Sequence, residues 1–576
     1  MSTNVPITHV VLPHFLLPRL PMRLYTYIDP QDSPHLPTPV MNESLSFYLN
    51  DIKHHINTHE YLWETFKKFT NVYEYIHSTI PYKKYCISRY RPLSRSFFKM
   101  IELIHFFELG TDSQQPMRTF HLAEGPGGFI EAMVKYRNCT DDRYTGMTLM
   151  DKNNNDYNIP AWKKSQHFLQ ENKNVHIESG YDKTGNILSL DNFIYINEVY
   201  GSSMDLITAD GGFDFSTDFD HQEINMTKLL YGQILYALCM QKQGGCFILK
   251  IFDVFMQHTI DMIALLASMY EKVYITKPNT SRSANSEKYV VCKGFLYASS
   301  YKFFPILQQS FRKVLACNDG TMVIAPKSVK SGSRSGSQDE HNMPIPSKHR
   351  YITRIFNNLP INYFFMNRLE ECNIILGQNQ IENIYVTLSF IVGECMPQCR
   401  ANWVTSSPPG LVKDRKQTYK CTGTDSQLIQ ERSGQTMFGR IYDALRPDEV
   451  GSPAKQLQTP SGCVTASSPR VCRNIQERSG QTMFGRISNN IPENDVGVCR
   501  NIEIVDPTYH SVPIETDLRE TLKGIEAVEF PASAKGSIAD TPNQRNFYRT
   551  KIHNLIKTNI QKCIQWCIQH NLAYNY

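Results

Sequence analysis

The sequence predicts an α/β protein with a doubly wound, mostly parallel sheet that is covered by helices on both faces. Between residues 119 and 300, short apolar runs alternate with longer stretches of helical periodicity. A glycine turn, Gly125-Pro126-Gly127-Gly128, joins the first apolar run to the first helical stretch, and ionisable residues follow two later runs. Such alternation is typical of parallel sheets, which bind ligands beyond the carboxyl ends of their strands.

The apolar spacing places the individual elements. Strands are predicted at 119–123, 144–149, 205–209, 246–250, 272–276 and 289–292, and helices at 128–137, 226–242 and 258–271. A strongly apolar helix is expected from Ile101 to Leu109, and residues 43–80 also have a helical rhythm. The proline-rich residues 1–40 favour an irregular segment.

Composition divides the chain into segments. We predict a helical N-terminal region (1–84), an α/β domain (85–325), a Ser/Gly-rich linker (326–348), a small accessory region (349–404), a polar insertion that forms a less ordered C-terminal extension (405–545), and a closing amphipathic docking helix (546–576). The accessory region regains apolar content, so it either forms a second domain or covers the first.

The polar insertion contains an internal repeat. Residues 429–441 recur word for word at 475–487, and residues 471–475 recur at 498–502. Two copies are too few for a solenoid, so we interpret the repeat as a poorly ordered duplication with no assigned chemistry.

Length and composition limit the class of protein. A chain of 576 residues has room for two to four domains, and its net charge of +5 means that any basic face must be local. The 15 cysteines are scattered singly, which favours a reducing, cytoplasmic compartment. No uncharged apolar run approaches ~18 residues and the N-terminus lacks a basic n-region, so we expect no membrane span and no signal peptide.

Three cysteines, Cys395, Cys399 and Cys421, are the candidate metal ligands. A zinc site would require a fourth ligand at regular spacing, whereas unpaired thiols require nothing further. We favour unpaired thiols and predict no metal.

Single residues leave two interpretations open. The glycine turn is either an ordinary turn or a cradle where the backbone approaches a nucleotide-like ligand, helped by the free N–H groups of a helix start. Asp210 and Lys250 each follow a predicted strand, where a charge marks either a site or the point at which the chain reaches water. Lys99, at the start of its helix, is by default a solvated lysine.

Four stretches, in chain order, resemble the Lys-Asp-Lys-Glu tetrad of the FtsJ/RrmJ-like ribose 2′-O-methyltransferases. They are Ser94 to Lys99, Asp210 after its strand, Gly244 to Lys250, and Ser281 to Glu287. The glycine turn is similar to the S-adenosylmethionine loop of that family, and residues 121–129, 182–187 and 208–214 resemble its branch that methylates mRNA cap nucleotides. The resemblance covers residues 85–300 and departs from many members at His121, where they carry an acidic residue.

This resemblance implies a Rossmann-like S-adenosylmethionine-dependent methyltransferase sheet with catalytic residues Lys99, Asp210, Lys250 and Glu287. Lys250 would be the general base, Lys99 its cationic neighbour, and the two carboxylates would hold the lysines and a ribose hydroxyl in line. Positioning of the reacting groups lowers the activation barrier by several kcal/mol, and proton transfer to a base raises the rate ~10²–10⁴-fold. No metal is needed, because a sulfonium already activates its methyl group.

The resemblance also implies a binding site for S-adenosyl-L-methionine. Its predicted residues are Glu124, Gly125, Pro126, Gly127, Gly128, Asp151 and Asp182. Asp151 is placed for the cofactor's ribose hydroxyls and Asp182 for its adenine amino group; the alternative for Asp151 is an ordinary loop acid.

RNA would be bound by Arg89, Arg91 and Arg95, which alternate with tyrosines before Lys99. A solvated basic loop is the alternative. The implied substrate is capped mRNA, methylated at a cap-proximal nucleotide; rRNA or tRNA, or a non-catalytic RNA-binding module on the same fold, are the alternatives. A likeness to viral members implies viral mRNA, a location in the host cytoplasm or the virion, and other capping or transcription proteins as partners.

Overall fold

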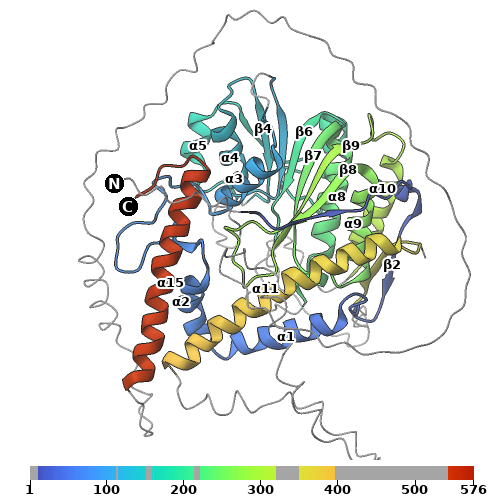
Figure 1. The fold of residues 1–576 in the computed structure, drawn as a ribbon. Helices are drawn as coiled ribbons and strands as arrows, with labels where there is room; N and C mark the ends of the chain where they lie inside the picture. Colours follow the sequence, from blue (N-terminus) through green and yellow to red (C-terminus); the bar gives the residue numbers. More distant parts are fainter. Residues whose placement is uncertain are drawn as a thin grey trace, which may run out of the picture. The chain divides into compact units, whose positions relative to one another are not determined.

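A doubly wound sheet of eight strands forms the centre of the described residues (Figure 1). The strands, in sheet order, are β1 (His14–Leu17), β8 (Tyr270–Thr276), β9 (Lys288–Phe295), β7 (Gln241–Ile251), β6 (Met204–Ala209), β3 (Arg118–Leu122), β4 (Arg143–Met147) and β5 (Val175–Glu178). The strands from β5 to β7 run parallel, β9 lies antiparallel between β7 and β8, and β1 is an antiparallel edge. The predicted α/β methyltransferase sheet is confirmed.

The chain's computed structural model describes residues 11–111, 115–150, 159, 161–212, 221–318, 349–357, 359–395 and 542–575. These residues belong to one compact unit, Met1–Ser406 with Glu515–Tyr576. The second unit, Ser407–Ile514, contains the internal repeat and lies outside the described residues, as does the predicted linker at 326–348.

Successive residues of the central strands enter two different cores, one on each face of the sheet. Phe247 and Leu249 of β7 pack into the core with α6 (Leu190–Tyr200), α8 (Thr227–Met240), α9 (Gln257–Met269) and α10 (Phe304–Ala316). Ile248, between them, packs into the core with α3 (Ser96–Phe107) and α4 (Gly128–Arg137). This alternation is the period of two expected of a strand buried on both faces.

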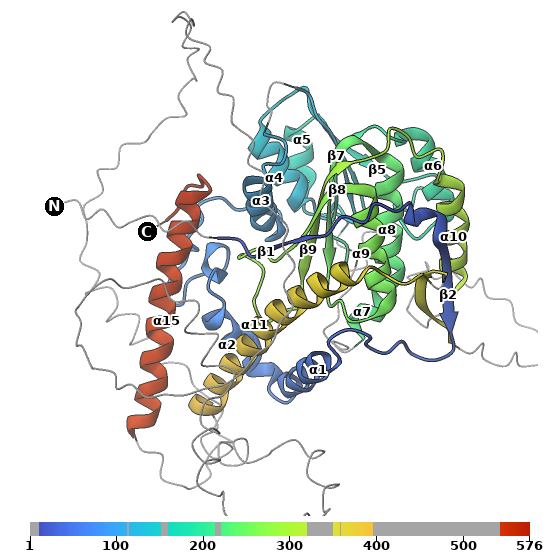
Figure 2. The same cartoon turned by 45° about the vertical axis from the view of Figure 1, so that its right-hand side comes forward.

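Four further helices extend the second core away from the sheet. They are α1 (Glu43–Asn57), α2 (Glu60–Thr70), α11 (Tyr363–Cys395) and α15 (Pro542–Gln569). Figures 1 and 2 both show α11 alongside α1, and α15 alongside α2. The predicted N-terminal helices and the closing helix are present, and the accessory segment at 349–395 packs on the same unit.

Sequence reasoning was wrong about residues 1–40 and missed several internal elements. β1 pairs with β8, and β2 (Ile28–Ser33) pairs with β10 (Tyr351–Phe356). Both N-terminal strands are short edge strands, where prolines are tolerated, and their partners lie more than 200 residues away. The other missed elements are α5 (Gln166–Glu171), β5, α6, α7 (Gln222–Asn225) and α10.

Two features, a membrane-spanning helix and a metal-binding cluster, are absent from the described part of the chain. None of its helices is long and apolar enough to cross a membrane. It holds no group of three or more His, Cys, Asp or Glu side chains arranged for a metal ion. Cys399 and Cys421 lie outside the described residues.

Candidate active site

The parallel register brings the predicted site residues to one edge of the sheet. Leu122 of β3 pairs with Ala209 of β6, which pairs with Leu249 of β7. The residues that follow these three, through Glu124, Asp210 and Lys250, therefore leave the sheet at the same carboxyl edge. Ligands of doubly wound sheets bind at this edge.

Two lysine–carboxylate pairs lie at this edge. The Nζ atom of Lys99, from the first turn of α3, lies 2.7 Å from Oε1 and 2.8 Å from Oε2 of Glu287. The Nζ atom of Lys250 donates to the backbone oxygen of Asp210 at 2.6 Å and lies 3.3 Å from its Oδ1. All four side chains are at least four-fifths buried, so the default interpretation of Lys99 as a solvated lysine is wrong.

Tyr289 connects the two pairs and was missed from the sequence. Its hydroxyl donates to Oδ1 of Asp210 at 2.8 Å, and the Lys99 Nζ atom lies 6.0 Å from its ring centroid. Burial, and next the negative charges of Asp210 and Glu287, hold the Tyr289 pKa far above its ordinary value, so the hydroxyl remains a donor. The available signal was its position in β9 two residues after Glu287, opposite Lys250.

Positive charge converges on Glu287. Burial alone would raise the pKa of this carboxyl, but the ammonium groups of Lys99 and Lys250 outweigh burial and hold it below its ordinary range. The Ser281 hydroxyl also donates to its Oε1 at 2.8 Å. Glu287 is therefore an anion that both tetrad lysines face.

Lys277 fixes the backbone beside Glu287. Its Nζ donates to the Glu287 backbone oxygen at 2.8 Å and to the backbone oxygen of Asn285 at 2.8 Å. Burial lowers the pKa of Lys277 to about 7, although the Glu287 charge opposes this. The loop that carries Glu287 is thus held by an amine that titrates near neutral pH.

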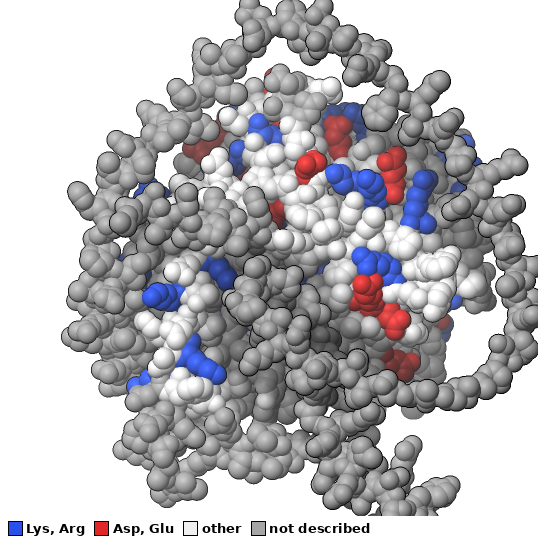
Figure 3. All heavy atoms as spheres, in the orientation of Figure 1, with Lys and Arg blue, Asp and Glu red and all other residues white. Residues whose placement is uncertain are grey.

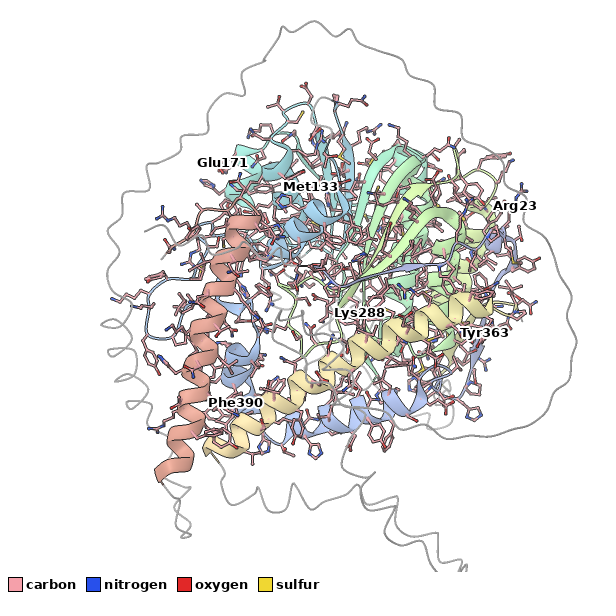
Figure 4. All side chains as sticks on the ribbon, in the orientation of Figure 1. Arg23, Met133, Glu171, Lys288, Tyr363 and Phe390 are labelled. Atoms are coloured by element: carbon pink, nitrogen blue, oxygen red, sulfur yellow. The ribbon has the colours of Figure 1, made fainter. Side chains whose placement is uncertain are left out.

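A second buried charge cluster anchors the same loop to α1. Asp253 lies 3.0 Å from the Nζ atom of Lys53 in α1 and 3.5 Å from that of Lys288, and it accepts from the Ser286 hydroxyl at 2.9 Å. Lys288 lies between the sheet and α11 (Figure 4). From α11, Gln380 reaches Ser286 at 3.3 Å. The N-terminal helices and α11 therefore help to position the tetrad.

The glycine turn begins α4 but differs from the expected cradle in one respect. Gly127 has φ = +107°, which favours glycine, and precedes the first residue of α4. The N–H of Phe129 donates to Oε1 of Glu124 at 2.6 Å. The helix start is thus partly capped by the chain's own carboxylate, whereas the sequence suggested that its N–H groups would be free for an anionic ligand.

The glycines are also required by packing within the protein. A Cβ atom on Gly125 would lie 2.5 Å from the Ala161 backbone oxygen, and one on Gly128 would collide with the hydroxyls of Ser94 and Ser96. A Cβ on Gly127 would lie 3.3 Å from the Trp162 ring. Pro126 accepts a hydrogen bond from the Ser165 hydroxyl through its backbone oxygen. Segment 161–165 therefore closes over the turn.

Glu124 carries an unused acceptor in the turn. Its Oε2 is buried and has no partner in the described residues, while burial and next the Asp210 charge hold the pKa of this carboxyl well above its ordinary value. S-adenosylmethionine is a cation with an amino group and ribose hydroxyls, all of which can interact with or donate to a carboxylate. The residues of the turn fit this group.

Of the two remaining predicted cofactor residues, the structure describes Asp182 but not Asp151. Oδ1 of Asp182 accepts from the Thr184 N–H and the Asn192 amide at 2.9 Å each, and the side chain is exposed at the end of β5. Burial raises the pKa of the Asp182 carboxyl, but these hydrogen bonds outweigh burial and lower the pKa below its ordinary value. Asp151 lies outside the described residues.

His121, the position at which the sequence departs from many family members, belongs to the core. It is fully buried, and its two ring nitrogens lie 2.8 Å from the Thr119 hydroxyl and 2.7 Å from the Thr208 hydroxyl. Burial lowers its pKa to about 3, so the ring is neutral.

The three predicted RNA-binding arginines do not share one environment. Arg91 is exposed, and Arg89 is exposed with its Nε 3.2 Å from Oδ1 of Asn575. Arg95 is half-buried and donates to the Thr280 backbone oxygen at 3.1 Å. Only the first two present their charge to solvent. On the face drawn in Figure 3, basic and acidic side chains are interspersed over most of the α/β domain.

The fold and these residues define a methyltransferase-type domain, and comparisons with known proteins agree. Residues 92–295 match the profile of the FtsJ-like methyltransferases, so this part of the chain is similar to an FtsJ-like methyltransferase domain. It is 34% identical over 166 residues to cap-specific mRNA (nucleoside-2′-O-)-methyltransferase 1 of Trypanosoma brucei brucei, covering 28% of this chain and 45% of the relative.

Two zebrafish proteins show the range of the similarity. Cap-specific mRNA (nucleoside-2′-O-)-methyltransferase 1 of Danio rerio is 34% identical over 222 residues, covering 35% of this chain and 26% of the relative. Cap-specific mRNA (nucleoside-2′-O-)-methyltransferase 2 is 27% identical over 379 residues, covering 61% of this chain and 46% of the relative. The chain thus spans less than half the length of each of these relatives.

Proposed function

We propose that this chain is an S-adenosylmethionine-dependent RNA ribose 2′-O-methyltransferase that modifies a cap-proximal nucleotide of mRNA. The observation that carries the proposal is that two ion pairs, Lys99–Glu287 and Lys250–Asp210, lie at the same carboxyl edge of the sheet as the glycine turn. Burying a lysine–carboxylate pair costs desolvation free energy, so such a pair at a ligand-binding edge is a candidate for a functional role. Removing a proton from a hydroxyl is such a role.

In this mechanism Lys250 removes the proton from the ribose 2′-hydroxyl. Its Nζ is held by the backbone oxygen and Oδ1 of Asp210, which orient the amine and leave its remaining direction for the hydroxyl. Tyr289 keeps the Asp210 carboxylate in place through its hydroxyl. Proton transfer of this kind contributes ~10²–10⁴-fold.

Lys99 and Glu287 position the hydroxyl and balance the charge. Glu287 faces both lysines, so it stabilises Lys250 as that residue becomes an ammonium ion. Lys99 keeps Glu287 ionised through its two short contacts. S-adenosylmethionine, when bound, supplies a methyl group that its sulfonium charge activates, and Glu124, Gly127 and Asp182 are the described residues that would hold it.

The choice of capped mRNA is supported by the relatives described above, which are cap-specific mRNA (nucleoside-2′-O-)-methyltransferases. Ribosomal or transfer RNA would be modified by the same chemistry. A viral origin of the mRNA, a cytoplasmic or virion location and partner proteins of capping or transcription are parts of the proposal that rest on the sequence resemblance alone.

The experiment that tests the proposal offers labelled S-adenosylmethionine and the full chain with three RNAs: a capped 20-mer, the same RNA uncapped, and a folded tRNA. The proposal predicts label on the capped RNA alone. Label on the tRNA or equally on the uncapped RNA supports the other RNA substrates, and label on none of them supports a non-catalytic RNA-binding module.

A further inference from the structure

The closing helix α15 carries charge of one sign. Residues 541–576 contain no Asp or Glu, whereas the helix contains Arg545, Arg549, Lys551, Lys557 and Lys562. Along the lower part of α15 in Figure 1, the described surface in Figure 3 shows basic side chains without acidic neighbours. A basic surface without acids attracts polyanions.

One face of the helix is used for docking. Ile552, Ile556, Cys563 and Trp566 are buried in the core that α2, α3 and α11 share. The Trp566 Nε1 atom donates to Oε1 of Glu102 in α3 at 3.1 Å. These contacts fix which face of α15 points to solvent.

The opposite face is exposed and holds the charge. Lys551, Asn554, Lys557, Gln561 and Lys562 are exposed, and at 3.6 residues per turn they fall within a sector of about 140° on one side of the helix. No ion pair engages Lys557 or Lys562 within the part of the chain that the structure describes. Lys551 lies 4.5 Å from the ring centroid of exposed Phe547. The three ammonium groups extend over about 16 Å of helix length.

The end of α15 leads toward the tetrad. After the helix, the N–H of Arg89 donates to the Ala573 backbone oxygen at 2.9 Å, and the N–H of Asn575 donates to that of Ile87 at 2.7 Å. Ser88 and Tyr574 form a β-bridge. Residues 87–89 belong to the segment that continues into α3, where Lys99 stands. Arg89 therefore lies where the end of α15 meets the segment that leads to Lys99 of the tetrad.

We propose that the exposed face of α15 binds the phosphate backbone of the RNA strand downstream of the methylated nucleotide. This inference rests on the proposed function for the identity of the polyanion and adds the path of the substrate. Lysines bind phosphates as point charges without reading bases, so this face would bind RNA of any sequence. Exposed Tyr574, which forms a β-bridge with Ser88 beside Arg89, provides a stacking surface between the helix and the segment that leads to the tetrad.

The test compares two triple variants of the full chain with equal charge changes. One is K551Q/K557Q/K562Q, and the matched control is K173Q/K242Q/K302Q, whose lysines are exposed on other elements. Binding of an uncapped, fluorescent 20-mer of single-stranded RNA is measured between low and moderate salt, with thermal unfolding to verify that both variants are folded. Methyl transfer to a capped 20-mer and a capped tetranucleotide is measured in parallel.

The proposal predicts that the α15 variant binds the 20-mer about tenfold more weakly than the control at low salt. Its salt-dependence slope should fall by about 2, because each phosphate contact on a single strand contributes about 0.7. KM for the capped 20-mer should rise by a similar factor, while kcat and KM for the tetranucleotide stay unchanged, because so short an RNA ends before the helix.

Equal RNA binding by the two triple variants overturns the proposal. Loss of binding to phosphatidylserine vesicles with unchanged RNA binding overturns it too and assigns the face to a membrane surface. If the wild type transfers no methyl group but the α15 variant still loses RNA binding relative to the control, the proposed function fails and this inference stands.

Discussion

The ammonium group of Lys99 contacts both carboxylate oxygens of Glu287, at 2.7 and 2.8 Å, although 188 residues separate the two in the chain. The contact forms because α3 packs over β9, the inner strand that begins at Lys288, so a residue from each comes to the same buried point. Breaking a buried pair by removing one partner leaves an uncompensated charge. The pair is therefore a constraint on where the rest of the site can lie.

Replacing Lys250 by alanine should remove methyl transfer and leave cofactor binding intact. The amine is the proposed base and acts on the hydroxyl, so a loss of ~10²–10⁴-fold in kcat is expected. Single-turnover transfer and calorimetric titration of S-adenosylmethionine are the measurements. Lys242→Ala, on the exposed start of the same strand, is the control. Activity of Lys250→Ala within threefold of wild type would remove this residue from the role of base.

Tyr289→Phe should lower kcat about fivefold, because Asp210 loses one neutral donor, with a contribution of about 1 kcal/mol. The affinity for S-adenosylmethionine should not change. Tyr270→Phe is a matched control, since its hydroxyl is also buried and donates to Gln241 at 3.0 Å, away from the tetrad. Equal kcat values for the two variants would show that Tyr289 is a packing residue only.

Gly127→Val should abolish S-adenosylmethionine binding in a folded protein. A side chain at φ = +107° is strained, and its Cβ would meet the Trp162 ring at 3.3 Å, so the turn must rearrange. Gly244→Val isolates the backbone effect, because Gly244 also has a positive φ but open space around its Cβ position. Calorimetry should show wild-type affinity for the Gly244 variant. An unchanged affinity in the Gly127 variant would contradict the cradle.

Deleting residues 405–540 should leave a folded protein that binds S-adenosylmethionine. The deleted stretch lies outside the described residues, and its composition offers little apolar surface. The two helices that it joins meet: the rings of Phe390, labelled in Figure 4, and Tyr548 have centroids 6.2 Å apart. A shorter connection therefore costs little closure entropy.

Thermal unfolding and cofactor titration check this deletion. Removing 546–576 instead is the contrasting variant, since it uncovers the pocket of the buried Trp566 and should give an unstable protein. If the 405–540 deletion is insoluble or blind to the cofactor, the insertion is an integral part of the catalytic unit.

Stability should fall in acid partly through His570. Its Nδ1 lies 2.7 Å from that of His105, and burial, followed by the His105 charge, lowers the His570 pKa to about 3. Because the folded pKa lies below the ordinary 6.5, the unfolded chain takes up the proton first as the pH falls. The free energy of unfolding is then lost below pH 6.5, by up to ~1.4 kcal/mol per pH unit.

Denaturant titrations at pH 7.5 and 5.5 test this expectation. His570→Gln should lose less stability between the two pH values than wild type does, by about 1 kcal/mol. The same loss in both proteins would mean that His570 does not contribute to the acid sensitivity.

Sequence reasoning predicted the central strands because their apolar runs are long and regular. Strand ends drew attention to Asp210 and Lys250, but Lys99 and Glu287 were predicted only through the resemblance to the FtsJ/RrmJ-like methyltransferases. Sequence reasoning could not find β1 and β2, which are short, are flanked or interrupted by proline, and form strands only against partners far along the chain. Tyr289 escaped because an aromatic residue in a buried strand is normally a core residue, and its hydroxyl contact with Asp210 depends on the antiparallel register of β7 and β9.

The glycine turn shows a second limit of sequence reasoning: its position was predicted, but its contacts were not. The turn was predicted, but its helix start is partly capped by Glu124, and its glycines are required by Ser94, Ser96 and Ala161 as well as by a ligand. Ser94, Ser96 and Ala161 lie more than 25 residues from the glycines they contact, so local sequence carries no record of those contacts.

The most direct test of the central claim uses three capped 20-mers that differ in one atom: all ribose, 2′-deoxy at the first nucleotide, and 2′-deoxy at the second. Transfer of labelled methyl groups to each is measured with the full chain and with Lys250→Ala. The account predicts that wild type labels the all-ribose RNA, that one of the two deoxy substitutions abolishes the label, and that Lys250→Ala labels none. Equal labelling of all three RNAs would contradict a cap-proximal ribose 2′-hydroxyl as the acceptor.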